Sequence, residues 1–455
     1  MTFTVTNPAT GQVAEAFNTM DESDTQASID ASADAFREWR RTDLSHRAAL
    51  MHAVAWGLES EKTGHARLMA LEMGKPIGDG AAEIEKCAWL CRYYADHADE
   101  MLKPRPAATD AANSYVMFAP LGVLLGVMPW NYPFWQVFRF AVPALMAGNT
   151  VLLKHAASVP GCALAIQAAM QKAGFPEAVF QSLMIPSDRV QQVLAHPDVR
   201  AVTLTGSRSS GSAVAAQAGA MIKKSVLELG GSDPYLILAD ADLDTAVDAC
   251  VSGRLLNSGQ SCIAAKRIIT VGDIRREFEK RLVEKMKAIR VGDPLNEQTE
   301  VGPLAGSAFR DTLHRQVRKS IDQGAHCLLG GKIPEGEGFF YPVTVLTDVR
   351  PGMPVFDEET FGPVAAVIAA SSESEAIDLA NGSDYGLGAA VFTRDIERGE
   401  RIAAQELDAG NAFVNAFVKS DPRLPFGGIK QSGFGRELSH YGIESFVNVK
   451  TVYVA

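Results

Sequence analysis

The sequence is poor in cysteine and in positive charge, and each shortage excludes a class of protein. Six cysteines in 455 residues are too few for a disulfide framework, so we expect free thiols in a reducing compartment. Acidic residues outnumber basic ones by 54 to 43, which gives a formal charge of −11. Nucleic acids and anionic membrane surfaces bind positively charged faces, so neither is an expected partner.

Long hydrophobic runs are missing as well. The most apolar stretch, residues 121–147, is interrupted by three prolines and by Asn131, Gln136 and Arg139, so no span of about 20 apolar residues remains. The first residues, MTFTVTNPATGQV, contain neither a basic segment nor an apolar segment, which argues against a secretory signal. We therefore expect a cytoplasmic protein.

Hydrophobic periodicity predicts an α/β fold. Helical patterns cover residues 21–40, 45–73 and 80–101, and a link rich in Ala and Pro (103–114) leads to a strand over 115–127. Strands over 150–154, 201–206, 225–231 and 233–240 then alternate with helices over 163–173 and 209–219. A second series contains strands over 267–271, 363–370 and 411–415. Alternation of this kind predicts two doubly wound domains with parallel sheets.

The last residues, ESFVNVKTVYVA, alternate like an edge strand. We expect this strand to pair with another subunit or with the strand predicted over 115–127.

Two residues are candidates for covalent chemistry. Cys262 lies in NSGQSCIAAKR, after a turn that contains Gly, and a thiolate is the strongest soft nucleophile among side chains. A lone cysteine is more often a small buried hydrophobe, so its spacing alone decides nothing. Glu228 lies among apolar residues in LELGG, where burial would raise its pKa and make it a base near neutrality. A salt-bridged or surface glutamate is the alternative.

Other short motifs are weak signals taken singly. Gly206, Ser207 and Gly211 follow a predicted strand and open a predicted helix, where backbone N–H groups can bind phosphate, although ordinary βα turns also use these residues. Asn131 in MPWNYPFW could donate to an oxyanion, or could be a turn residue.

No metal site is predicted. Cys87 and Cys91 are four residues apart on a predicted helix, and His97 is six residues further on. Without a second ligand pair, this spacing favours packing on one helix face over a zinc site.

Several of these motifs occur together and in a fixed order, which resembles the NAD(P)-dependent aldehyde dehydrogenase superfamily over nearly the whole chain. ELGG and GQSC are especially specific, because their Glu228 and Cys262 lie 34 residues apart. The motifs in order are PWNYP, TVLLKHA, TLTGS, LELGG, GQSC, EETFGPV, NAFVN and PFGGIKQSGFGRE.

The resemblance implies a mechanism. Cys262 matches the family nucleophile, the Asn131 side chain and the Cys262 backbone N–H match its oxyanion hole, and Glu228 matches its general base. The thiolate attacks an aldehyde, a hydride leaves for the nicotinamide, and water activated by Glu228 hydrolyses the thioester. A coenzyme A-dependent enzyme would have no use for Glu228, and an inactive relative or a cysteine hydrolase fits the intact motifs poorly.

The resemblance also implies a domain plan and a cofactor site. Residues 1–105 and 125–228 correspond to the dinucleotide-binding domain, 229–432 to the catalytic domain, and 106–124 with 433–455 to an oligomerisation arm and tail, so we expect a homodimer or homotetramer. The implied cofactor residues are Trp130, Lys154, His155, Ala157, Ser158, Gly206, Ser207, Gly211, Leu229, Glu359 and Phe361.

Cofactor preference depends on Ala157. NAD-selective relatives often have a glutamate at that position, three residues after the ribose lysine, which here is Lys154. Without this carboxylate nothing repels a 2′-phosphate, and Lys154 with His155 or Ser158 could bind one. We therefore expect NADP to be mildly favoured, with NAD also accepted.

The substrate is predicted from Arg139. The runs WNYPFWQVFRFAVPALMAGN and VKSDPRLPFGG resemble the short succinate-semialdehyde dehydrogenases of bacteria. A guanidinium on an apolar segment is costly to bury without an anion, and it matches a carboxylate well. We expect Arg139 to bind the distal carboxylate of a four-carbon semialdehyde, with Ser420 as a second donor and Trp135 as a wall. The alternatives are a structural salt bridge for Arg139 and an enzyme for uncharged aliphatic or aromatic aldehydes.

Overall fold

The N-terminal segment folds into a hairpin and four helices. The computed structural model describes residues 2–455, and its hairpin is built from β1 (Thr2–Thr6) and β2 (Val13–Asn18). The helices are α1 (Glu22–Trp39), α2 (Leu44–Ser60), α3 (Lys62–Met73) and α4 (Ile77–Leu102). The side chain of Asp21 caps α1 by accepting from the Asp24 backbone N–H at 2.8 Å. The helix predicted over 45–73 is two helices, because the backbone leaves helical geometry at Glu61.

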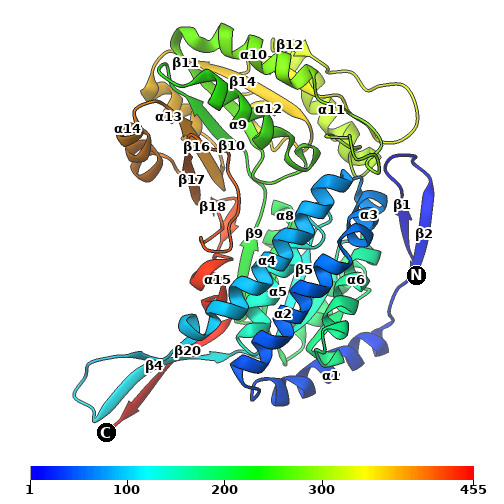
Figure 1. The fold of residues 1–455 in the computed structure, drawn as a ribbon, viewed down its shortest axis with the longest axis vertical. Coiled ribbons are helices and arrows are strands. Elements are labelled where there is room, and N and C mark those ends of the chain that lie inside the picture. Colours follow the sequence, from blue (N-terminus) through cyan, green and yellow to red (C-terminus); the bar gives the residue numbers. More distant parts are fainter. Residues whose placement is uncertain (1) are drawn as a thin grey trace.

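The first large sheet has six strands in the order β19-β9-β8-β5-β6-β7, and all pair in parallel except β19. Its strands are β5 (Val123–Met128), β6 (Thr150–His155), β7 (Phe180–Ser182), β8 (Val199–Thr205), β9 (Lys224–Glu228) and β19 (Gly433–Phe434). The helices of this unit are α5 (Trp135–Met146), α6 (Pro160–Lys172), α7 (Val190–Ala195) and α8 (Arg208–Ala220). This unit forms the lower body in Figure 1.

The single strand predicted over 115–127 is wrong. The chain forms two strands there, β4 (Asn113–Pro120) and β5, and they belong to different sheets. The break lies at Gly122, whose φ of +144° is strained for other residues. Apolar periodicity runs through both strands, so it gives no sign of this turn.

The second large sheet has seven strands in the order β12-β13-β14-β11-β10-β16-β17, with only β12 antiparallel. Its strands are β10 (Asp233–Ile237), β11 (Ala265–Val271), β12 (His326–Leu329), β13 (Thr344–Thr347), β14 (Val364–Ala370), β16 (Gly388–Phe392) and β17 (Asn411–Val414). Its helices are α9 (Leu243–Leu255), α10 (Arg275–Lys287), α11 (Ser307–Asp322), α12 (Pro354–Asp357), α13 (Glu373–Asn381) and α14 (Ile396–Arg401). Two parallel, helix-covered sheets confirm the predicted α/β class.

A thin arm extends from the first unit and ends at the C-terminus (Figure 1). In it β20 (Val447–Val454) pairs antiparallel with β4 over its whole length, and β3 (Arg105–Pro106) lies on the other side of β4. Of the two partners expected for the terminal strand, the chain's own earlier strand is the one observed. Before the arm, β19 joins the first sheet and α15 (Ser439–Glu444) packs on α5. Residues 433–446 therefore return to the first unit.

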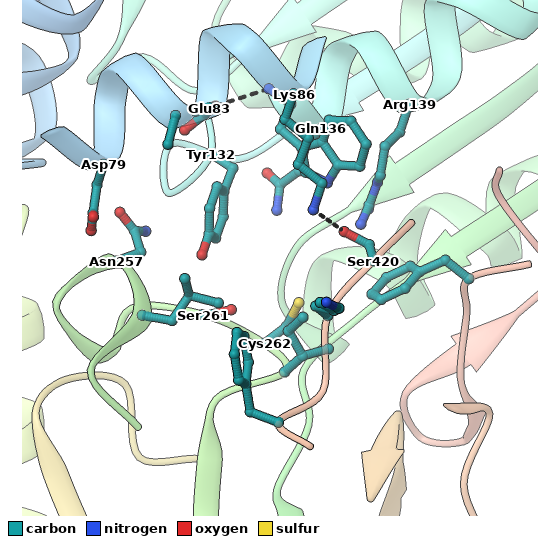
Figure 2. Close-up of a pocket in the computed structure, with 17 residues that line it drawn as sticks. Asp79, Glu83, Lys86, Tyr132, Gln136, Arg139, Asn257, Ser261, Cys262 and Ser420 are labelled. Atoms are coloured by element: carbon teal, nitrogen blue, oxygen red, sulfur yellow. Dashed lines mark hydrogen bonds between the residues drawn. The ribbon is translucent and has the colours of Figure 1, made fainter. Parts of the chain in front are cut away.

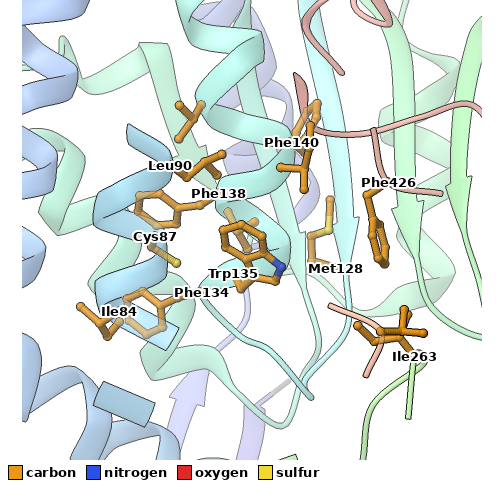
Figure 3. Packing of buried hydrophobic residues seen from close by; sticks show 14 of the residues in the cluster. Ile84, Cys87, Leu90, Met128, Phe134, Trp135, Phe138, Phe140, Ile263 and Phe426 are labelled. Carbon is orange, nitrogen blue, oxygen red and sulfur yellow. The ribbon is translucent and has the colours of Figure 1, made fainter. Parts of the chain in front are cut away.

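Helices α4 and α5 pack closely against each other (Figure 3). Every residue of α5 is buried, because the helix lies between α4 and the first sheet. Cys87 and Cys91 are buried on the inner face of α4, as their helical spacing predicts. Gly126 on β5 permits close approach, because a Cβ there would lie 2.8 Å from the Phe140 ring. No helix within residues 2–455 is both long enough and apolar enough to cross a bilayer.

Candidate active site

Cys262 lies on a strained loop between α9 and β11. Three consecutive residues before it, Asn257, Ser258 and Gly259, have φ values of 55°, 57° and 76°. Left-handed backbone is costly for Asn and Ser, and such strain is often found at functional sites. Gly259 is required here, because a Cβ would lie 2.3 Å from the carbonyl oxygen of Gly362.

Two buried cations hold this loop through its backbone carbonyls. The Arg254 Nη2 donates to the Gly259 oxygen at 2.7 Å. The Lys266 Nζ donates to the carbonyl oxygens of Ser261 at 2.9 Å and Cys262 at 2.6 Å. Sequence reasoning did not identify Arg254 or Lys266. The one signal in the sequence is that Arg254 lies shortly before, and Lys266 near the end of, the segment that contains Cys262.

Asn131 connects the first unit to the nucleophile loop. Its Nδ2 donates to the Gln260 carbonyl oxygen at 3.0 Å, and the Nδ2 of Asn257 donates to the Asn131 carbonyl oxygen at 2.7 Å. An amide carries two N–H groups, so one remains for a ligand. Within residues 2–455 the backbone N–H of Cys262 donates to no acceptor. These two donors suit an oxyanion that forms beside the Cys262 sulfur.

The ELGG segment brings three motifs together. Glu228 ends β9, and the two glycines that follow it lie between Glu359 and the nucleophile loop. A Cβ on Gly230 would lie 2.3 Å from the Glu359 Oε2, and one on Gly231 would lie 2.7 Å from the Cys262 carbonyl oxygen. The Gly231 N–H also donates to the Glu359 Oε1 at 3.0 Å. The paired glycines are therefore needed for contact between the predicted base, nucleophile and cofactor segments.

Burial raises the pKa of both predicted catalytic groups. It raises the pKa of Cys262 to about 12, against the opposing charges of Arg139 and Lys266. It also raises the pKa of Glu228 well above its usual range, and the nearby Glu437 adds to this effect. Both carboxyl oxygens of Glu228 are buried without a hydrogen-bond partner among the described residues. A buried carboxyl group of this kind suits proton transfer with a water molecule.

A cavity of about 260 Å³ opens beside the Cys262 thiol (Figure 2). Its walls come from α4, α5, the nucleophile loop and the segment after β17. The three predicted substrate residues, Arg139, Trp135 and Ser420, all line it. Lys86 on α4 also lines it and was missed, because one lysine on a long helix looks like a surface residue. Other lining residues are Asp79, Glu83, Tyr132, Gln136, Phe417 and Phe426.

Arg139 is both a cavity residue and one half of a buried ion pair. Its Nε lies 2.6 Å from the Glu437 Oε2, and both side chains are almost completely buried. Its Nη2 has no hydrogen-bond partner among the described residues. The salt bridge that the sequence left open therefore exists, and an unpartnered N–H group remains beside the cavity. Glu437 was not predicted, although it lies in the final motif.

The predicted phosphate turn has the geometry expected of an anion site. Ser207 caps α8, its Oγ accepting from the Ser210 N–H at 3.3 Å, and Gly206 precedes it at the end of β8. A Cβ on Gly211 would lie 2.5 Å from the Leu229 side chain, so glycine is needed for close packing there. The free N–H groups of this helix end fit a pyrophosphate.

The residues after β6 differ in what they can offer a ligand. Lys154 donates to the Ser187 Oγ at 2.9 Å and forms no ion pair within the described chain. Ala157 is exposed and Ser158 half-buried. His155 is buried with both ring nitrogens engaged, to the Pro133 oxygen at 2.9 Å and the Ala156 N–H at 2.8 Å, which does not favour a ligand contact.

Two aromatic residues of the predicted cofactor site contact each other. The Trp130 ring meets Phe361 edge-on at 5.8 Å between centroids. Phe361 follows Glu359, so the residues expected to hold a nicotinamide ribose and ring lie together. In residues 2–455, no group of three or more His, Cys, Asp or Glu side chains is arranged to hold a metal ion.

The Arg139–Glu437 pair predicts a specific stability pattern. Changing Arg139→Met should lower the free energy of unfolding by about 3–5 kcal/mol, because it leaves a buried carboxyl group without its partner. The double variant Arg139→Met with Glu437→Met should recover much of that loss, since no unpaired charge remains. Denaturant titration of the parent, of Arg139→Met, of Glu437→Met and of the double variant tests this. A double variant as unstable as the sum of both single changes would contradict it.

Comparison with known proteins agrees with this geometry. Residues 1–452 match the model of the aldehyde dehydrogenase family. The chain is 47% identical over 455 residues, covering all of both chains, to a "probable succinate-semialdehyde dehydrogenase (NADP+)" of Synechocystis sp.. It is 45% identical to the "succinate semialdehyde dehydrogenase (NAD(P)+) Sad" of Escherichia coli K12, covering 98% of this chain and 96% of that protein.

A solved structure extends the comparison to the whole fold. The succinic semialdehyde dehydrogenase of Streptococcus pyogenes in complex with NADP+ superimposes with a TM-score of 0.97 at 36% identity, covering 99% of both chains. The sequence match and the structural match agree with the motifs assembled around Cys262. The chain belongs to the aldehyde dehydrogenase family.

Proposed function

We propose that the protein oxidises succinic semialdehyde to succinate with NADP+ or NAD+ as the oxidant. One observation carries this proposal: the cavity that holds the Cys262 thiol also holds basic donors. An aldehyde at the sulfur and a carboxylate at those donors would occupy the two ends of one small space. The names of the relatives from Synechocystis, E. coli and S. pyogenes support the same substrate.

The chain's own residues account for the acyl-transfer steps. The Cys262 sulfur attacks the aldehyde carbon, and the Asn131 amide and the Cys262 N–H stabilise the resulting alkoxide. The bound nicotinamide supplies the hydride acceptor. Glu228 then takes a proton from the water that hydrolyses the thioester on Cys262. Arg139 and Lys266 favour the thiolate, because their charges oppose the rise in the pKa of Cys262 caused by burial.

The residues at the first sheet fit a dinucleotide. Gly206, Ser207 and Gly211 would face its pyrophosphate, and Lys154 with Ser158 would face the adenosine ribose, beside Ala157. Trp130, Leu229, Glu359 and Phe361 would surround the nicotinamide end. NADP is mildly favoured, since Lys154 has no acidic partner to neutralise it and no carboxylate stands at Ala157.

The domain plan and assembly are part of the same proposal. Residues 1–105 and 125–228 would bind the cofactor, 229–432 would carry the nucleophile, and 106–124 with 433–455 would form the arm and tail. Exposed Val449, Tyr453 and Val454 on the arm support burial against a second copy, in a homodimer or homotetramer in the cytoplasm.

The substrate proposal is tested by comparing two aldehydes. Succinic semialdehyde should give a kcat/KM about 100-fold or more above that of butanal, because a site built for a carboxylate leaves its donors unpaired with an uncharged chain. Steady-state assays at 340 nm with either cofactor measure this ratio. Equal efficiency for the two substrates would favour an enzyme for uncharged aldehydes.

The cofactor preference is tested at Lys154. Changing Lys154→Met should raise the KM for NADP+ about 10- to 100-fold and that for NAD+ much less, because only NADP+ loses a charge-assisted contact to a 2′-phosphate. Lys172→Met on α6 is the matched control, since that lysine is exposed and pairs with Glu61. An equal change in KM for both cofactors would show that Lys154 does not contact the 2′-phosphate of NADP+.

A further inference from the structure

Lys86 enters the cavity from α4 and has unusual surroundings. Its side chain is half-buried, and its Nζ lies 4.4 Å from the centre of the Trp135 ring. The Nζ donates to the Ser420 Oγ at 2.9 Å, across the space above Cys262 (Figure 2). No acidic oxygen of the described chain lies within 4.0 Å of this ammonium group.

The acids nearest to Lys86 are already committed to other partners. Glu83, one helical turn earlier, forms a buried ion pair with Lys75 and accepts two backbone N–H groups at 2.9 Å each. Asp421 is held by Arg423, at 2.8 Å from the Nε and 2.7 Å from the Nη2. Neither acid is therefore free to neutralise Lys86.

The charge of Arg139 is balanced by a buried carboxylate, that of Glu437. The carboxyl group of Glu437 lies 2.6 Å from the Arg139 Nε, while the Arg139 Nη2 has no hydrogen-bond partner among the described residues. Lys419 also lines the cavity, but it is exposed, so water solvates its charge. Among the cations that line the cavity, Lys86 is thus the half-buried one with no acidic oxygen of residues 2–455 within 4.0 Å.

We propose that Lys86 is the specificity-determining cation for the substrate carboxylate. Ser420 and the Nη2 of Arg139 lie beside it as further hydrogen-bond donors. This inference rests on the proposed function and names the group that supplies the charge. Arg139 contributes hydrogen bonds, because Glu437 already balances its charge. Lys86 contributes the unbalanced positive charge that an anionic substrate neutralises.

Removing a charge from water is costly unless an opposite charge accompanies it. A partly desolvated ammonium without a counter-ion is unfavourable, so a cavity of this kind gains most from an anionic ligand. Burial, and then the like charge of Arg139, lower the pKa of Lys86 to about 8. A carboxylate bound next to the ammonium group favours its charged form and therefore raises the pKa of Lys86 toward its ordinary value.

The direct test is Lys86→Met with two substrates. We expect kcat/KM for succinic semialdehyde to fall about 10- to 100-fold, through KM rather than kcat, while butanal is oxidised as by the parent enzyme. Lys86→Arg should keep most of the preference, because it keeps the charge. Lys103→Met is the matched control at the other end of α4, where the lysine is exposed and pairs with Glu100.

The outcomes separate this inference from the proposed function. If the parent enzyme does not prefer succinic semialdehyde to butanal, the proposed function fails. If the parent enzyme has that preference and Lys86→Met retains it, the substrate proposal stands and the role of Lys86 is overturned. Thermal unfolding of each variant, together with unchanged butanal oxidation, shows that a loss does not come from misfolding.

A pH profile gives a second, independent readout. The ratio of kcat/KM for succinic semialdehyde to that for butanal cancels ionisations of Cys262 and Glu228 that affect both substrates. This ratio should fall above about pH 8 in the parent enzyme, as Lys86 loses its proton. In Lys86→Arg it should stay flat, because a guanidinium remains charged. A ratio independent of pH in the parent enzyme would contradict the inference.

Charged and titratable groups around Lys86 are Glu83, Cys87, Arg139, Asp421 and, in the cavity, Asp79, Cys262 and Lys419.

Discussion

The contact between Asn131 and the nucleophile loop is the constraint on which the rest of the site depends. Two buried hydrogen bonds, from Asn131 to Gln260 and from Asn257 to Asn131, join the end of β5 to the approach to β11. They fix the distance between an amide donor from one unit and a sulfur from the other. The left-handed backbone before Cys262 is tolerated because these bonds, together with Arg254 and Lys266, hold the loop in one shape.

Charge balance is the second organising feature. Two buried ion pairs lie near the cavity, Lys75 with Glu83 and Arg139 with Glu437. Pairing removes most of the cost of burial and leaves those groups structural. Lys86 has no ion-pair partner among the described residues, and burial raises the pKa values of Cys262 and Glu228. We propose that these groups act in substrate binding and catalysis. An anionic aldehyde would bring the missing charge into this space.

Much of the fold can be predicted from the spacing of apolar residues in the sequence. Long helices such as α1 and α4 bury one face, and strands such as β6 and β11 are buried on both faces, so each leaves a clear hydrophobic pattern. The motif residues are predictable too, since paired glycines beside Glu228 and a cysteine after a Gly turn are rare in combination. The boundary between β4 and β5 was not predictable, because one left-handed glycine between two apolar strands leaves no mark on the pattern. Glu437, Lys86 and the loop cations were missed for another reason. Their roles come from partners far away in the chain, as with Lys86 and Ser420, which are 334 positions apart.

We propose that an acyl group forms on Cys262 and that Glu228 is needed only to remove it. Rapid-quench mass spectrometry of Glu228→Gln, mixed with succinic semialdehyde and NADP+, tests this directly. We expect a thioester on the peptide that contains Cys262, no adduct in Cys262→Ala, and slow release because the hydrolytic base is absent. Reduced cofactor formed without any acyl group on Cys262, or an acyl group mapped to another cysteine, would contradict it.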